Sequence, residues 1–355
     1  MDKFLLTEKR KLDIMFFNYI FNNKIRNVIN ETFGHPLISN KDFKWINPIY
    51  DLINIVNNEI LSAKIIVEKN NAQLLDTIKL SLDDLGFTDE LGIDNGIIDI
   101  NVKNLINYDL SVEDYIFLEN SFSSGSYKFN LKNKENAKIT INCIAINGKV
   151  IPHTLIPSFL HELIHSYEEL KRNDNKTFKH FINTFIDFKL TNNSSEKFIG
   201  ILFKEEIQSL KNVLYRLFNG EDNALIGNLL GEFITYEIFS YNDFEKYKNK
   251  LKPFKILEQL ENDINIIKNI NDERLFQFIK SNAKILIGKQ FNEDGTFEYI
   301  TRNIISSDPI KIKKLFIKIL EKKYLKLYKK LLSTSGKYIV LFQNYYKTVI
   351  ETVET

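Results

Sequence analysis

The spacing of apolar residues predicts helices over most of the chain. Segments 10–30 and 50–85 carry apolar residues three or four positions apart, as one face of a helix requires. Glycine and proline are scarce, at 13 and 6 residues, so long helices with few interruptions are expected. The same spacing recurs beyond residue 152, in the segments 157–170, 177–190, 195–218, 222–240, 253–285 and 309–332.

The period changes in segment 95–151, where apolar and polar residues alternate. Residues 98–102 and 139–143 show this alternation, which is typical of strands with one buried face. Asn147 and Gly148 separate two such runs and are the residue types that a tight hairpin turn needs, because both turn positions require positive φ. The segment therefore predicts a small, mostly antiparallel sheet.

These patterns together predict an α+β protein that is mainly α. A helical N-terminal region is expected over 1–94, a core over 95–250 and a basic helical region over 251–355. Pro152 is expected to end the sheet, and Pro157 is well placed as the first residue of the following helix.

Composition narrows the class of protein. An apolar fraction of 44% with 26% charged residues is ordinary for a soluble globular chain, and a net charge of +2 identifies no partner. The single cysteine, Cys143, excludes an intramolecular disulfide and a cysteine-built zinc site. Charges in the first ten residues argue against a signal peptide, and no apolar run is long enough for a transmembrane segment. A cytoplasmic protein is expected.

The chemistry is concentrated in His161-Glu162-Leu163-Ile164-His165. Residues four apart on a helix lie one above the other, so His161 and His165 can present two imidazole nitrogens to one Zn²⁺ ion. Glu162 then flanks the metal without binding it, and its carboxylate can accept a proton from an attacking water as a general base. Attack of that water on a polarised carbonyl is peptide hydrolysis, so the expected substrate is a polypeptide.

A catalytic zinc site needs a third protein ligand, and several residues are candidates. Glu221 leads, because it stands at the start of a predicted helix with small residues that could approach the motif helix closely. His180 lies fifteen residues after His165, while Glu232 and Glu237 share the helix of Glu221. The sequence alone leaves this choice open.

Residues 158–167, preceded by a sheet, resemble the zincin superfamily of metallopeptidases. The resemblance implies a zinc peptidase with Glu162 as general base and an edge strand beside the motif helix, for which segment 137–146 is the candidate. A glutamate as third ligand would make the chain similar to the gluzincins. The stretch Tyr215–Ala224 also resembles phage-type reading frames with an upstream HExxH motif.

The spacing to His180 resembles that of SprT-like proteases, which act near DNA. Those proteins usually have glycine after this histidine, where this chain has Phe181, and that difference weakens the likeness. A helix over 311–332 with nine lysines could meet nucleic acid or a membrane surface, although a packed helix with a solvated lysine face is the simpler interpretation.

Three functions therefore stand as hypotheses. The first is a zinc-dependent endopeptidase. The second is a non-catalytic structural or cargo protein that keeps a zincin fold for assembly with other proteins. Such a protein would lie in the virion if a phage encodes it. The abundance of residues with AT-rich codons fits a phage or its low-GC host. The third is the SprT-like DNA-proximal protease.

His153 is a further candidate for the cleft, and three tyrosines are candidates for stabilising an oxyanion: Tyr215, Tyr236 and Tyr241.

Overall fold

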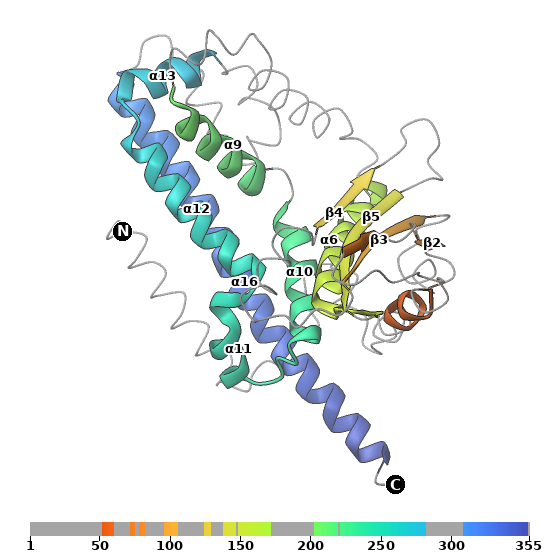
Figure 1. The fold of residues 1–355 in the computed structure, drawn as a ribbon. Helices are drawn as coiled ribbons and strands as arrows, with labels where there is room; N and C mark the ends of the chain where they lie inside the picture. Colours follow the sequence, from red (N-terminus) through yellow and green to blue (C-terminus); the bar gives the residue numbers. More distant parts are fainter. Residues whose placement is uncertain are drawn as a thin grey trace. The chain divides into compact units, whose positions relative to one another are not determined.

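The computed structural model describes residues 52–59, 72–74, 78–81, 85, 96–105, 124–128, 138–146, 148–171, 202–218, 221–281 and 308–353. The described part of the chain is mainly helical with one small sheet, so the predicted α+β class is confirmed (Figure 1). It divides into two compact units, each assembled from separate stretches of sequence. The first unit includes Arg172–Asp222 and Lys252–Ser333, and the second Tyr19–Lys171, Asn223–Leu251 and Thr334–Thr355.

The sheet belongs to the second unit and is mixed. Its main path runs β1-β3-β5-β4, with β2 paired to β3 and β6 paired to β5. Four of the five described pairings are antiparallel, whereas the central pair β3–β5 is parallel. The strands are β1 (Ala72–Leu74), β2 (Ile78–Ser81), β3 (Ile97–Leu105), β4 (Ser124–Lys128), β5 (Lys138–Ile146) and β6 (Lys149–Val150).

Two predictions about these strands were wrong. Segment 50–85 was expected to be helical, yet within it only 52–59 is a described helix, and β1 and β2 pair with β3. Their apolar residues are spaced so that helix and strand periods both fit, and pairing with β3 decides between them. Segment 137–146 was expected at the sheet edge, but β5 lies between β3 and β4. The polar sequence Ser-Gly-Ser-Tyr-Lys of β4 suits the edge better than the apolar β5 does.

The predicted hairpin is confirmed. Ile146 of β5 faces Lys149 of β6 across the turn, and Gly148 has a φ of 82°. Gly148 N–H also donates to the side chain of Asn104 on β3, which ties the turn to the centre of the sheet. Only glycine takes this left-handed conformation without a steric cost.

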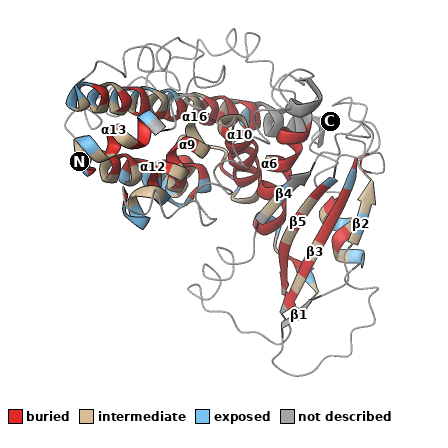
Figure 2. Cartoon of the chain, turned by 90° about the horizontal axis from the view of Figure 1, so that it is seen from above, coloured by how far each residue is buried: buried red, intermediate tan, exposed pale blue. Residues whose placement is uncertain are grey.

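One face of the sheet packs against α6 (Pro152–Lys171) (Figure 1), and the side chains on this face are apolar. Within 98–102 of β3 and 139–143 of β5, alternate residues are fully buried on this face and the intervening positions are polar. The N-terminal end of α6 is attached to the sheet because Thr154 Oγ1 accepts from Ile144 N–H and donates to Ile151 C=O. The buried positions, red in Figure 2, include Ile98, Ile100, Val102, Ile139, Ile141 and Cys143.

The helix α6 starts earlier than predicted. Pro152, not Pro157, is its first residue, and Pro157 lies inside the helix at its sixth position. Proline there removes one hydrogen bond near the helix end, where several N–H groups are unpaired in any case. The buried residues that follow hold the helix on the sheet: Leu155, Ile156, Phe159, Leu160, Leu163 and Ile164.

The described part of the first unit is helical. α9 (Lys204–Phe218), α12 (Lys252–Asn269) and α13 (Asp272–Ser281) pack with the first part of α16 (Pro309–Val353). Buried Glu261 of α12 accepts from Tyr324 of α16, and Lys268 pairs with Glu321 at 2.7 Å. The predicted helix 253–285 is two helices, because the Asn271 side chain accepts from the N–H groups of Glu273 and Arg274 and so starts a new helix.

The helix α16 begins as predicted and ends later. Pro309 is its first residue and the Asp308 carboxylate accepts from Ile310 N–H. The helix continues past residue 332 because Thr334 and Ser335 are buried within it rather than forming a linker. Its apolar side over 312–331 is buried in the first unit, so packing accounts for its amphipathic pattern. A contact of 311–332 with nucleic acid or a membrane stays a prediction.

The second unit also holds α10 (Glu221–Thr235), apart from its first two residues, and α11 (Tyr241–Tyr247) with the short 3-10 helix η4 (Lys248–Lys250). No helix in the described part of the chain is both long enough and apolar enough to cross a membrane.

Candidate metal centre

The motif helix brings two histidines together. His161 Nε2 and His165 Nε2 are 3.2 Å apart, with the rings edge to face. Two nitrogens bound to one tetrahedral Zn²⁺ at 2.0–2.1 Å would be about 3.3 Å apart. His165 is 7% exposed, and His161 is only slightly more open. The two imidazoles therefore already have the separation that a shared metal ion needs.

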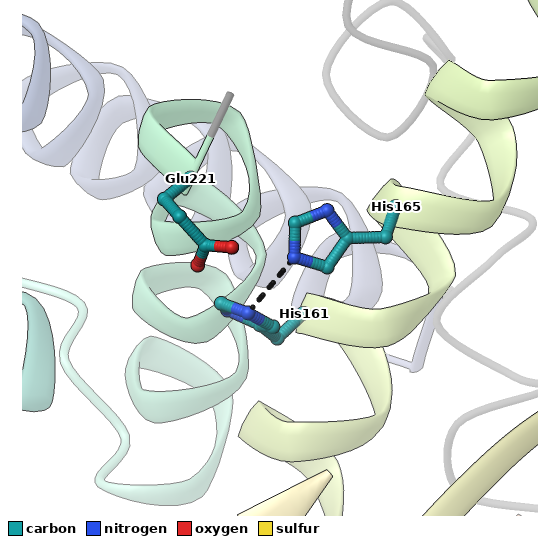
Figure 3. A group of neighbouring side chains, drawn as sticks. All are labelled: His161, His165 and Glu221. Carbon is teal, nitrogen blue, oxygen red and sulfur yellow. Dashed lines mark hydrogen bonds between the residues drawn. The ribbon is translucent and has the colours of Figure 1, made fainter. Parts of the chain in front are cut away.

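Glu221 approaches the same point from α10. The metal-ligating atoms of His161, His165 and Glu221 all lie within 4.8 Å of one another (Figure 3). Glu221 is 1% exposed, and as the first residue of α10 its negative charge is favoured by the helix dipole. Arg216 Nη1 lies 3.8 Å from its Oε2. This buried group of two imidazoles and one carboxylate could hold a metal ion.

Small residues allow α10 to come this close to α6. A Cβ atom built on Gly227 would lie 2.6 Å from Leu160 O, and one on Gly231 would lie 2.6 Å from Pro157 Cα. The two helices are therefore in backbone contact. Glu221 lies near His165, Gly227 near Leu160 and Gly231 near Pro157, so the helices run antiparallel. The helix of Glu221 thus approaches the motif helix closely, and Gly227 and Gly231 are the small residues that allow it.

Asn228 is part of the site, and sequence reasoning missed it. Its Oδ1 lies 2.7 Å from His161 Nδ1, and its Nδ2 donates to Pro157 C=O at 2.9 Å. The side chain is fully buried. A signal was available: Asn228 is the one polar residue in the run 224–231, and it follows Glu221 by seven residues, which places both on one helix face.

Glu162 lies beside the edge strand β4. A Cβ atom on Gly125 would meet Glu162 Cγ at 2.7 Å and Oε1 at 2.8 Å, so the glutamate side chain crosses close to the strand. Glu162 Oε1 is 4.0 Å from His161 Nε2, and the residue is 6% exposed. Its carboxylate thus lies beside the His161 imidazole, and Glu162 is not a member of the group formed by His161, His165 and Glu221.

The structure does not bring the other glutamate candidates to this group. Glu232 is buried on α10 about 16 Å along the helix axis from Glu221. Glu237 lies beyond the end of α10, exposed and with a φ of 53°. It occupies the left-handed position of a helix-ending motif in which Ile238 N–H donates to Phe233 C=O. His180 lies outside the described residues.

His153 and Tyr236 lie away from the metal candidates. Their rings stack at 5.6 Å, and Tyr236 stacks in turn on Tyr247 of α11 at 5.4 Å. His153 precedes His161 by two turns, or about 12 Å along α6. Burial lowers the pKa of His153 from 6.5 to about 4. These rings connect the start of α6 to the end of α10.

The contacts of the remaining tyrosine candidates, Tyr215 and Tyr241, do not indicate a catalytic role. Tyr215 lies beside Arg216, whose guanidinium carbon is 5.6 Å from the ring centre. Tyr241 is the first residue of α11, after the Ser240 cap. Their part in stabilising an oxyanion stays a prediction.

Comparison of the chain with protein families, with curated proteins and with solved structures yields no match.

Proposed function

We propose that this protein is a zinc-dependent endopeptidase of zincin type. The observation that carries the proposal is the buried group of His161, His165 and Glu221 with the Glu162 carboxylate beside it. Two imidazoles and one carboxylate are a ligand set that suits a catalytic zinc, since three protein ligands leave one position open. Zinc bound there would polarise a carbonyl group and lower the pKa of a water molecule.

Glu162 has the position that a general base needs. It follows the first histidine directly, so it does not share the face of the metal ligands, yet its Oε1 is 4.0 Å from His161 Nε2. A carboxylate there can accept a proton from an attacking water and deliver it to the leaving amine. Burial beside β4 restricts the conformations of its side chain.

The edge strand supports a polypeptide as substrate. Among the described strands β4 pairs with β5 alone, and an extended peptide that paired with the other edge of β4 would extend the sheet by one strand. Gly125 of β4 lies against Glu162, since a Cβ atom built on it would be 2.8 Å from Glu162 Oε1. A peptide added along β4 would therefore run near the group that activates water.

The variant Glu162→Gln tests this mechanism. It keeps the shape of the side chain and removes the base, so cleavage of an unstructured peptide should fall at least about 100-fold while bound zinc is retained. Glu205→Gln, at an exposed position of α9, is the matched control and should cleave like the wild type. Undiminished cleavage by Glu162→Gln would refute the mechanism. A zinc-loaded wild type without any peptidase activity would favour the non-catalytic alternative.

A further inference from the structure

Asn228 contacts the motif helix at two points one turn apart. Its amide nitrogen donates to Pro157 C=O, and its amide oxygen lies 2.7 Å from Nδ1 of His161. The side chain is fully buried between α6 and α10, whose backbones meet at the neighbouring Gly227. Both contacts are therefore shielded from water, which strengthens them.

The chemistry of these contacts determines where the proton of His161 lies. A carbonyl oxygen can only accept a hydrogen bond, so the group of Asn228 that faces Pro157 must be its NH₂. The amide oxygen then faces His161 and can only accept as well. Nδ1 of His161 must therefore carry the proton, which in the neutral ring leaves Nε2 with a lone pair. That Nε2 atom is the one 3.2 Å from His165 Nε2.

We propose that Asn228 is a positioning residue that holds His161 in the Nδ1-protonated form, so that Nε2 is the metal-ligating atom. The inference rests on the proposed zinc function and deepens it. The backbone carbonyl of Pro157 orients the amide, the amide orients the imidazole, and the imidazole presents its lone pair to the metal. Partners of this kind commonly raise metal affinity by 10- to 100-fold.

Two variants separate this role from simple packing. Asn228→Asp keeps an oxygen acceptor for His161 and loses the donor to Pro157, whereas Asn228→Leu loses both. The zinc Kd, measured by competition with a chromophoric chelator, should weaken about 10- to 100-fold in Asn228→Leu. In Asn228→Asp it should stay within about threefold of the wild type or tighten, because a carboxylate accepts at least as strongly as an amide.

Stability and spectra provide readouts besides affinity. Both variants lose the bond to Pro157, so both should unfold at a lower temperature than the wild type in the zinc-free state. The visible spectrum of bound Co²⁺ should be unchanged in Asn228→Asp and altered in Asn228→Leu. Asn262, exposed on α12, is the matched control position, and its leucine and aspartate variants should leave both readouts unchanged.

The outcomes are distinguishable. Equal loss of affinity in both variants would show that the Pro157 contact matters rather than the acceptor, and would overturn the inference. Unchanged affinity in Asn228→Leu would overturn it as well, with the proposed function intact. If Asn228→Leu does not fold, retained affinity in Asn228→Asp supports the inference and a tenfold loss there refutes it. A wild type that binds no zinc would refute the proposed function and this role with it.

Discussion

Gly125 and Glu162 share a space that admits only one side chain. The Cβ atom of any other residue at position 125 would overlap Cγ of Glu162. The glutamate is a flexible side chain and can move, so the strand itself need not shift. A strand glycine is costly in backbone entropy, and here that cost is offset by the close approach it permits.

Gly125→Ala should therefore impair catalysis more than folding. The added methyl displaces the Glu162 carboxylate, and kcat for peptide cleavage should fall about tenfold or more, as for other misplaced catalytic groups. The unfolding temperature should change little, since alanine is no worse than glycine in a strand. Ser126→Ala, at the adjacent exposed position, is the control. Wild-type kcat in Gly125→Ala would contradict the placement of Glu162.

His153 makes the stability of the chain sensitive to acid. Its pKa is lowered from 6.5 to about 4 by burial, so the folded state keeps the ring neutral where the unfolded chain would protonate it. The unfolded state thus binds more protons between pH 6.5 and 4, and stability falls as the pH falls through this window.

The loss of stability from His153 is at most about 3.4 kcal/mol, because each pKa unit corresponds to about 1.36 kcal/mol. His153→Phe keeps a ring for stacking on Tyr236 and removes the titration, so it should lose less stability on acidification. Urea unfolding of the zinc-free protein at pH 7, 5.5 and 4.5 measures the difference. Parallel pH profiles for the two proteins would show that His153 is not the responsible group.

At the scale of elements, the approach of α10 to α6 builds the site. Gly227 and Gly231 bring the two backbones into contact, and this places Glu221 near His165 and Asn228 against His161. The obstacle to a side chain at Gly227 is the Leu160 carbonyl, which cannot swing aside as the Glu162 side chain can.

The variant Gly227→Ala tests this contact, because the contact determines whether the free energy of unfolding rises or falls. In an uncrowded helix interior, replacing glycine by alanine stabilises by about 1 kcal/mol. Here the methyl must push the helices apart, and unfolding free energy should instead fall by about 1–3 kcal/mol. Zinc affinity should weaken as well, since Glu221 moves with α10. An increase in stability, measured by urea unfolding, would show that the helices are not in contact.

The elements that could be predicted from the sequence are those determined by residues adjacent in the chain. The hairpin at Gly148 and the start of α16 at Pro309 were predicted because a few adjacent residues determine them. The strands of 72–81 and the edge position of β4 were not, since strand pairing depends on residues far apart in sequence. Pro157 was misassigned because packing on the sheet outweighs one missing hydrogen bond.

The residues of the candidate site also differ in this respect, since some are adjacent in the sequence and others are distant. His161, Glu162 and His165 are adjacent on one helix, so their spacing alone predicts a metal site. Glu221 lies 56 residues beyond His165. It could only be ranked among alternatives, because the crossing of two helices determines which carboxylate approaches. Asn228 acts through a side chain hydrogen bond across that crossing, and a pattern search for metal ligands does not look for an amide.

At the scale of the molecule, the candidate chemistry is carried by α6, α10 and β4. α6 and β4 lie in the second unit, as does all of α10 from Asn223 onward. The helices of the first unit have buried apolar faces of their own and ion pairs such as Lys268 with Glu321 and Lys313 with Asp272. Arg216 and Glu221 both belong to this unit, and their side chains are 3.8 Å apart.

The most direct test is the zinc content of the purified full chain after dialysis into a zinc-buffered solution, measured by mass spectrometry of the metal. About one zinc per chain is predicted for the wild type, from the single three-ligand group among the described residues. His165→Ala and Glu221→Gln should lose that zinc, whereas Glu237→Gln, at an exposed position, should keep it. A wild type that takes up no zinc, or Glu221→Gln that holds zinc as tightly as the wild type, would contradict the account.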